Sequence, residues 1–280
     1  MSGIVINIDP VILYFGGFEL SWHSLAIMLG IIVAMLIAVY EDKRKGLPIN
    51  EIYSLTLWVV LGGVVGARLF HVIDEWSFYT SNPALILQFQ RGGLAIWGGL
   101  AGGAVVTVAY ARVKHLPLAR LVDVMTPGLL AAQIIGRFGC LINGDAYGGL
   151  TDLPWAFTYT HPGALLPLDL RGVPTHPYPL YEIIWNGLVL LAIWRLRHVF
   201  KKDGWVLLIY LPLYSLGRFL LTFVRQQDVT FGGLQQAQMI ALFVFAASVA
   251  MWIYWGRKRA LVVSVGDEQE PSVLGQEESR

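Results

Sequence analysis

Seven long apolar stretches, nearly free of charged residues, constrain this chain more than any other feature. They cover approximately residues 20–40, 52–73, 93–111, 121–141, 179–194, 205–224 and 236–255. A bilayer core about 30 Å thick is crossed by a helix of roughly 20 mostly apolar residues. Composition agrees, because 14% of the residues are charged, whereas a soluble domain has about 25%. We therefore expect an all-α integral membrane protein with about seven transmembrane helices.

The connections between these stretches define the expected domain organisation. Residues 1–263 should form one polytopic membrane domain, within which 143–178 is the longest connection and is rich in Pro, Gly and Thr. We expect this connection to form a small extracytoplasmic head. Residues 264–280 are acidic and almost lack large apolar side chains, so a disordered cytoplasmic tail is predicted there.

Lysine and arginine residues are distributed unevenly between the two sides of the predicted bundle. If the N-terminus is outside, fourteen of the twenty fall on inside segments and three on outside segments. The excess of positive residues on cytoplasmic loops fixes orientation. The sequence therefore predicts an N-terminus outside and a cytoplasmic C-terminus, in agreement with an odd number of spans.

Three arginines lie within the predicted spans. Arg68, Arg137 and Arg218 occupy the outer parts of their stretches, and each costs roughly 2.5 to 3.5 kcal/mol at a helix centre. The carboxylates of Asp123 and Asp145 do not obviously match them along the chain. An anionic lipid headgroup would compensate the charge, because a guanidinium binds phosphate in a bidentate way. The alternative is that these arginines reach the interface or bond internal carbonyl groups.

The residues around Arg137 and Arg218 indicate a site. After Arg137 the chain enters an Asn-Gly turn, where Asn143 offers a donor and an acceptor and Asp145 a carboxylate. Glycines at such turns let a ligand approach the backbone. Further along, polar residues spaced 4, 4 and 3 apart share one predicted helix face: Tyr214, Arg218, Thr222 and Arg225. We interpret this stripe as the lining of the same cavity, although an interhelical hydrogen-bonding face is the alternative.

Glycines recur four residues apart in the second and third stretches: Gly62, Gly66, Gly98, Gly99, Gly102 and Gly103. Such spacing lets two helices approach closely. Helix packing is the main interpretation, and a glycine-lined substrate cavity is the alternative.

The chain resembles the bacterial phosphatidylglycerol:prolipoprotein diacylglyceryl transferases across nearly its whole length. The strongest match is the segment 136–148, which is similar to the signature at the end of a central helix of that family. Supporting matches, in the same order along the chain, are segments 92–100, 176–182 and 214–219, followed by Arg225 and Gln226.

The resemblance implies an enzyme of the bacterial cytoplasmic membrane that moves a diacylglyceryl group from phosphatidylglycerol to the lipobox cysteine thiol of a prolipoprotein. It implies phosphatidylglycerol binding by Arg137, with Arg218 as its partner. The candidate catalytic residues are Arg137, Arg218, Asn143, Asp145, Tyr214 and His23. The candidate substrate-binding residues are Arg137, Arg218, Arg68, Gly98, Gly99 and Gly148.

The chain also departs from the usual pattern of that family. Trp97 stands where many members have a histidine, His23 where many have a tyrosine, Cys140 where an asparagine is common, and Thr222 where a glutamate is common. The base that deprotonates the thiol therefore stays open between His23, Asp145, Glu182 and the lipid phosphate. We interpret Cys140 as a small buried thiol in a packing role, since a thioether formed on it would be too stable to pass on.

Two other classes of function remain as alternatives. A membrane transporter for a small anion would also place arginines in the bilayer, and a non-enzymatic scaffold would leave the segment after Arg137 unexplained. The histidines show no ligand-like spacing and no nucleotide motif is present, so neither a metal site nor a cofactor is predicted. The expected partners are phosphatidylglycerol, the prolipoprotein signal peptide and membrane lipids. A net charge of +1 gives no indication of nucleic-acid binding.

Overall fold

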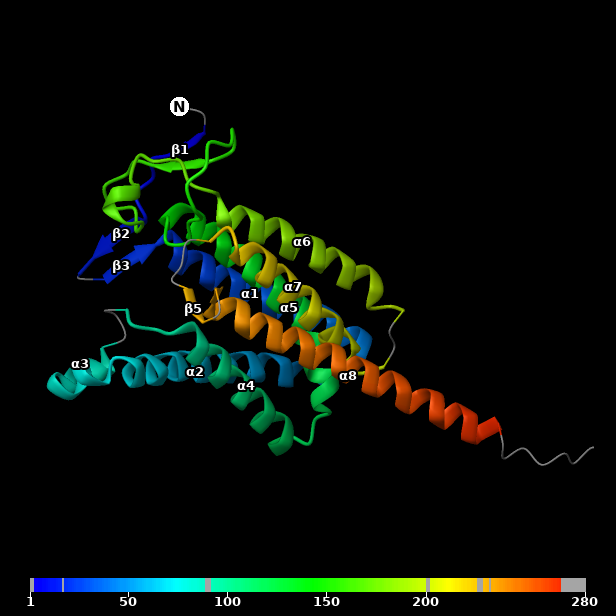
Figure 1. Ribbon diagram of the computed structural model, residues 1–280. Coiled ribbons are helices and arrows are strands. Elements are labelled where there is room, and N and C mark those ends of the chain that lie inside the picture. The colour runs from blue at the N-terminus through cyan, green and yellow to red at the C-terminus, as the bar shows by residue number, and fades with distance from the viewer. Residues whose placement is uncertain are drawn as a thin grey trace, which may run out of the picture.

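The computed structural model describes residues 3–16, 18–88, 92–199, 202–225, 229–231 and 233–267. Seven long helices dominate it (Figure 1): α1 (Trp22–Lys45), α2 (Ile49–Asp74), α4 (Ile96–Val113), α5 (Leu118–Asn143), α6 (Tyr178–Leu196), α7 (Trp205–Thr222) and α8 (Gln236–Asp267). All seven contain a stretch long and apolar enough to cross a membrane. The prediction of an all-α membrane protein with seven spans is confirmed, and each predicted span overlaps one helix.

The helices pack mainly in pairs. The most extensive contacts join α1 to α5 and α2 to α4, followed by α7 to α8 and α5 to α6. Glycines form the seam between α2 and α4, where a methyl group at Gly66 would overlap the carbonyl oxygen of Gly98 and one at Gly102 would overlap that of Gly62. The absence of side chains at these positions lets the two backbones touch, as the packing interpretation predicts.

A small head lies at one end of the bundle, where α1 begins and α5 ends (Figure 1). Strand β1 (Ile4–Ile6) pairs in parallel with β4 (Phe157–Tyr159), and β2 (Val11–Phe15) forms a hairpin with β3 (Phe18–Ser21). A buried cluster includes Ile6, Tyr159 and Leu170, the last of which belongs to the short helix η3 (Leu168–Leu170). The head therefore combines the predicted segment 143–178 with the N-terminal residues, which the sequence analysis did not include.

Short elements complete the described chain. They are α3 (Trp76–Ser81), η1 (Pro83–Leu87), β5 (Val229–Phe231) and β6 (Leu234–Gln235). Helix α8 continues to Asp267, and residues 268–280 of the predicted acidic tail lie outside the described residues.

Ion pairs connect the helices at the opposite end of the bundle, and the pair of Lys45 with Asp123 is buried. Lys45 Nζ lies 3.2 Å from Asp123 Oδ2 and 2.9 Å from Asp203 Oδ1, and Arg120 Nε lies 2.9 Å from Asp203 Oδ2. Burial raises the pKa of the Asp203 carboxyl, but hydrogen bonds from Lys45 and Arg120 outweigh this effect and leave the pKa below its ordinary value. At this end the charges are compensated by residues of the chain itself.

Candidate functional site

One carboxylate joins the two arginines that the sequence analysis placed together. Glu182, in the second turn of α6, has its Oε2 2.5 Å from Arg137 Nε on α5 and its Oε1 2.7 Å from Arg218 Nη1 on α7. The Glu182 side chain is buried, whereas both arginines are partly exposed. Three helices therefore converge on a single negative charge. The prediction that Arg137 and Arg218 lie together is consistent with these contacts, and Glu182 supplies the acid that chain spacing did not reveal.

Tyr178 and Arg225 extend this cluster. Arg218 Nη1 donates to the Tyr178 hydroxyl at 2.7 Å, and that hydroxyl donates to Glu182 Oε1 at 3.0 Å. The Arg225 guanidinium carbon lies 5.3 Å from the centre of the Tyr178 ring. Burial, together with the like charges of Arg218 and Arg137, lowers the pKa of Arg225.

The charge balance of this cluster is positive. Within the described part of the chain, the ion pairs of Arg137 and Arg218 both involve Glu182, and Arg225 has no ion pair. The group thus holds three guanidinium groups and one carboxylate, which pairs with two of them. An excess of positive charge at a partly buried site stabilises a bound anion. The planar guanidinium group can donate two parallel hydrogen bonds to a phosphate. We name residues Arg137, Arg218, Arg225, Glu182 and Tyr178 the arginine cluster.

Helix α7 ends at Thr222, so Arg225 lies beyond the helix. Backbone contacts with the head fix its position. Gly148 and Arg225 form an antiparallel bridge, and Gly149 N donates to Val224 O at 2.9 Å. A Cβ at Gly148 would lie 2.8 Å from Val224 O. Glycine at 148 therefore permits a close approach of the head backbone to the segment that carries Arg225.

A second group of polar residues lies beside Arg137, where α1 meets α5. Cys140 Sγ lies 3.7 Å from Arg137 Nη1 and 3.6 Å from His23 Nδ1. The donor atoms of His23, Cys140 and Asp145 all lie within 4.8 Å of one another. A Cβ at Gly139 would lie 2.7 Å from the His23 Cα, so glycine there lets His23 reach the thiol. The residues of this group, His23, Cys140 and Asp145, are called the thiol cluster.

Asn143 is the last residue of α5 and lies between Cys140 and Asp145 of the thiol cluster along the chain. Asn143 is buried and its Oδ1 has no hydrogen-bond partner among the described residues. Gly144, with φ of 74°, terminates α5, and its N–H donates to Cys140 O. The Tyr159 hydroxyl donates to Leu141 O at 2.8 Å, and burial followed by the charge of Asp145 raises the pKa of Tyr159. Tyr159 is therefore a stable donor that fixes this helix end.

Tyr214 lies one turn before Arg218 on α7, and Thr222 one turn after it. The Tyr214 ring stacks near Tyr210 at 5.4 Å between centroids, and its hydroxyl interacts electrostatically with Arg218, Glu182 and Arg137. Thr222 is buried and its hydroxyl donates to Arg218 O at 2.5 Å. Tyr214 therefore belongs beside the arginine cluster, whereas Thr222 satisfies a backbone carbonyl.

Arg68 has a different environment from the other two arginines. Its guanidinium donates to the carbonyl groups of residues that follow α3: Leu85, Ile86, Gln88, Gly92 and Gly93. Arg68 is buried, with its guanidinium carbon 5.3 Å from the centre of the Tyr79 ring. These contacts match the alternative of internal carbonyl pairing, so Arg68 fastens this segment onto α2.

Gly98 and Gly99, predicted to bind substrate, have their contacts with α2. Gly98 faces the Gly66 carbonyl, and a Cβ at Gly99 would lie 3.6 Å from Ala67 Cβ and from Gly63 O. These positions shape the α2–α4 seam. Their contacts do not join them to the arginine cluster.

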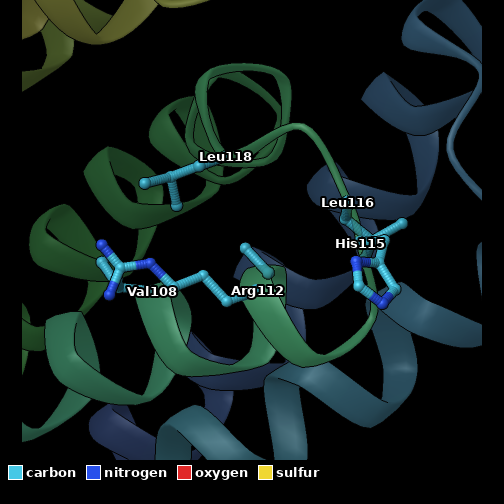
Figure 2. Close-up of a pocket in the computed structure, with 6 residues that line it drawn as sticks. Val108, Arg112, His115, Leu116 and Leu118 are labelled. Carbon is cyan, nitrogen blue, oxygen red and sulfur yellow. The ribbon is translucent and has the colours of Figure 1, made fainter.

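A cavity of about 420 Å³ lies at the opposite end of α5, beside the connection from α4. Arg112 and His115 border it on opposite sides, with Leu118 nearby (Figure 2). At a rise of 1.5 Å per residue, the nineteen positions from Leu118 to Arg137 span about 28 Å of helix. This cavity is therefore remote from both clusters.

Sequence reasoning named Arg137, Arg218, Asn143, Asp145, Tyr214 and His23, and the structure gathers them at one end of the bundle. Arg225 was expected in the cavity lining as part of the polar stripe after Arg218, whereas Tyr178 was not predicted as a site residue. Glu182 was considered as a base rather than as an ion-pair partner. Chain spacing gave no indication of a metal site, because the residues of the thiol cluster come from α1, α5 and the turn after α5.

Comparison with known proteins identifies similar chains. A family described as "Prolipoprotein diacylglyceryl transferase" matches residues 10–254. Three similar proteins bear the name phosphatidylglycerol–prolipoprotein diacylglyceryl transferase. The one from Clostridioides difficile is 33% identical over 89% of this chain and 96% of its own length. That from Lactobacillus acidophilus is 35% identical over 91% of each chain, and that from Synechococcus elongatus is 34% identical over 96% of this chain and 94% of its own.

Proposed function

The chain belongs to the prolipoprotein diacylglyceryl transferase family, and from that premise we propose that it transfers the diacylglyceryl group of phosphatidylglycerol to the lipobox cysteine of a prolipoprotein. It is a multi-pass membrane transferase of a bacterial family. The reaction is the first step of lipoprotein maturation, and its substrates are the lipid and the precursor protein.

The observation that carries the proposed mechanism is the positive excess of the arginine cluster. Two guanidinium groups lie within 2.7 Å of the Glu182 carboxylate, and the Arg225 guanidinium carbon lies 5.3 Å from the centre of the Tyr178 ring. Each partly exposed arginine keeps donors that Glu182 does not use, because a guanidinium has five N–H groups. The phosphate of phosphatidylglycerol is proposed to accept these donors. Glu182 keeps the arginines in place before the lipid arrives.

The same cluster stabilises the leaving group. The sulfur of the precursor attacks the glyceryl carbon, the carbon–oxygen bond to phosphate breaks, and the phosphate oxygen keeps the electron pair. Glycerol phosphate leaves with one more negative charge than the lipid phosphate carried. Fixed guanidinium groups favour that developing charge without reorganising, since their positions are set by Glu182 and Tyr178.

The thiol must lose its proton before it attacks, and four candidates for this role followed from the sequence. Glu182 is the weakest of them, because its two oxygens already face two arginines. His23 and Asp145 lie together beside Arg137. We propose that the thiol cluster forms the side of the site that receives the precursor cysteine, with Asn143 and Tyr214 as polar lining.

The orientation proposed for the chain has the N-terminus and the head outside and the C-terminus in the cytoplasm. Its support is the excess of Lys and Arg on the inside segments. This orientation places the arginine cluster near the outer leaflet, where a secreted precursor presents its lipobox. An anion transporter was the alternative, and no relative among those compared supports it.

The test is direct. The purified chain is incubated with phosphatidylglycerol vesicles and a synthetic lipobox peptide, and the peptide mass is measured. The expected result is a mass increase by one diacylglyceryl group together with release of glycerol phosphate. No mass increase with phosphatidylglycerol, under conditions where a curated relative modifies the same peptide, would contradict the proposed function.

A further inference from the structure

The thiol cluster has the composition of a metal site, and we propose that His23 Nδ1, Cys140 Sγ and the Asp145 carboxylate bind a zinc-class divalent cation that activates the precursor thiol. The inference rests on the proposed function for the identity of that thiol. It deepens the function by assigning a means of deprotonation. The expectation from chain spacing had been that no metal site exists.

The donor geometry is the first support. A tetrahedral zinc ion with bonds of about 2.3 Å to sulfur and about 2.0 Å to nitrogen places those two atoms about 3.5 Å apart. The measured separation of Cys140 Sγ and His23 Nδ1 is 3.6 Å. The three donors lie within 4.8 Å of one another, and Asp145 is exposed, so rotation of its side chain closes the remaining distance.

The backbone around the cluster is the second support. Because Gly139 has no side chain, the His23 backbone can pack closely against it; a Cβ at position 139 would lie 2.7 Å from the His23 Cα. Gly144 has a φ of 74° and reverses the chain directly before Asp145. Glycine at these two positions brings donors from α1, α5 and the following turn to one point. A buried packing thiol alone would require neither the histidine nor the carboxylate beside it.

The charge environment is the third support. A metal binds the thiolate form of cysteine, and Arg137 Nη1 lies 3.7 Å from Cys140 Sγ. A thiolate and a carboxylate together neutralise a divalent cation, so the loaded site is itself neutral beside Arg137. Zinc, with its affinity for sulfur and imidazole nitrogen, fits this donor set better than magnesium or calcium, which select oxygen ligands.

Three protein ligands leave one position of a tetrahedral ion open, as in catalytic zinc sites. The precursor thiol would occupy that position, because a coordinating thiol is deprotonated outright. Its proton passes to solvent. The bound sulfur then forms the carbon–sulfur bond with the glyceryl group as the phosphate, held by Arg137, takes the electron pair of the broken bond. Atoms and charge balance without an oxidant or a reductant.

The first measurement is the metal content of the full-length chain after purification in detergent and equilibration with zinc. About one equivalent is expected for the wild type, with at least a tenfold loss in His23→Ala and Cys140→Ser. His161→Ala is the matched control and should retain the metal, since His161 lies in the head and its Nδ1 accepts a hydrogen bond from Gly163 N. Size-exclusion profiles and melting temperatures show whether each variant is folded.

The second measurement uses cobalt(II) in place of zinc and does not depend on a variant that folds. A thiolate-to-cobalt charge-transfer band in the wild type supports the proposal, because Cys140 is the only cysteine in the sequence. Absence of the band and of bound zinc overturns it. Retention of zinc by Cys140→Ser at the level of His161→Ala also overturns it.

Transferase assays on the same samples separate this proposal from the proposed function. Full transfer to the lipobox peptide by metal-free protein refutes the metal role and leaves the transferase function standing. Bound metal without any transfer refutes the transferase function and leaves the metal site standing. Loss of transfer on chelation and its recovery on adding zinc supports both.

Discussion

Arg218 Nη1 lies 2.7 Å from Glu182 Oε1, although the two residues come from different helices and are separated by thirty-six positions in the chain. The same carboxyl group holds Arg137 through its other oxygen. The Glu182 carboxylate therefore positions both guanidinium groups relative to each other. Its replacement should affect both the fold and the chemistry.

Glu182→Gln keeps the shape of the side chain and removes its charge. Loss of one partner from a buried ion pair leaves the other charges uncompensated, so the free energy of unfolding should fall by about 3 kcal/mol. Transfer should also slow, since Arg137 and Arg218 lose their shared anchor. Denaturant unfolding in detergent and the peptide assay measure the two effects. Asp169→Asn, in the exposed part of η3, is the control and should change neither.

Arg137→Lys tests whether a planar guanidinium or only a positive charge is needed. Because Arg137 faces Glu182, Cys140 and the proposed phosphate at once, lysine should not replace it, and transfer should fall at least 100-fold, as with Arg137→Ala. The peptide mass assay measures this loss. Arg112→Ala, at the remote cavity of Figure 2, should retain activity. Wild-type rates for Arg137→Ala would refute the assignment.

Gly139→Ala and Gly136→Ala form a matched pair on α5. A methyl group at 139 would lie 2.7 Å from the His23 Cα, whereas one at 136 meets no atom within 4 Å. Overpacking of this kind costs about 1 to 3 kcal/mol, so Gly139→Ala should lower the melting temperature and the transfer rate. Gly136→Ala should leave the melting temperature unchanged or raise it, because alanine favours helix. Equal melting temperatures would contradict the contact between α1 and α5.

Asp203 should stabilise the protein in a pH-dependent way. Its folded-state pKa lies below the ordinary value of 3.8, so its contribution is present above that value and is lost as pH falls below it. Because Asp203 is partly exposed, the contribution should stay under about 1 kcal/mol. Melting temperatures of the wild type and Asp203→Asn should differ at pH 7 and converge as the pH falls below 3.8. A difference that grows on acidification would be inconsistent with the ion pairs to Lys45 and Arg120.

The proposed orientation places the C-terminus in the cytoplasm. Green fluorescent protein fused after residue 280 should therefore fluoresce, and alkaline phosphatase fused at the same place should be inactive. The reverse pattern would show that the head faces the cytoplasm, which would remove the proposed arginine cluster from the side where precursors emerge.

Much of the fold was predictable because membrane spans are encoded locally. A run of about 20 apolar residues identifies a helix without any knowledge of its neighbours, and the glycines of α2 and α4 predicted a close seam. The head was predicted only in part, since β1 joins it through a pairing with β4 that no local pattern indicates.

The site was harder to predict because it depends on how the helices are rotated about their axes. Arg137 and Arg218 were identifiable as costly charges in an apolar environment, but their shared partner Glu182 sits on a third helix and could be recognised only from the assembled bundle. Arg68 shows the converse. Its sequence context resembles that of Arg137, yet its donors are used by carbonyl groups of the segment after α3.

The parallel pairing of β1 with β4 has a consequence for biosynthesis. Ile4–Ile6 is synthesised more than 150 residues before its partner Phe157–Tyr159, and the long helices α1, α2, α4 and α5 lie between the two strands in the chain. Strand β1 therefore stays without this partner until β4 has been made and, in the proposed orientation, has crossed to the same side of the membrane. Closure of the head becomes a late event of insertion that draws the beginning and the middle of the chain together.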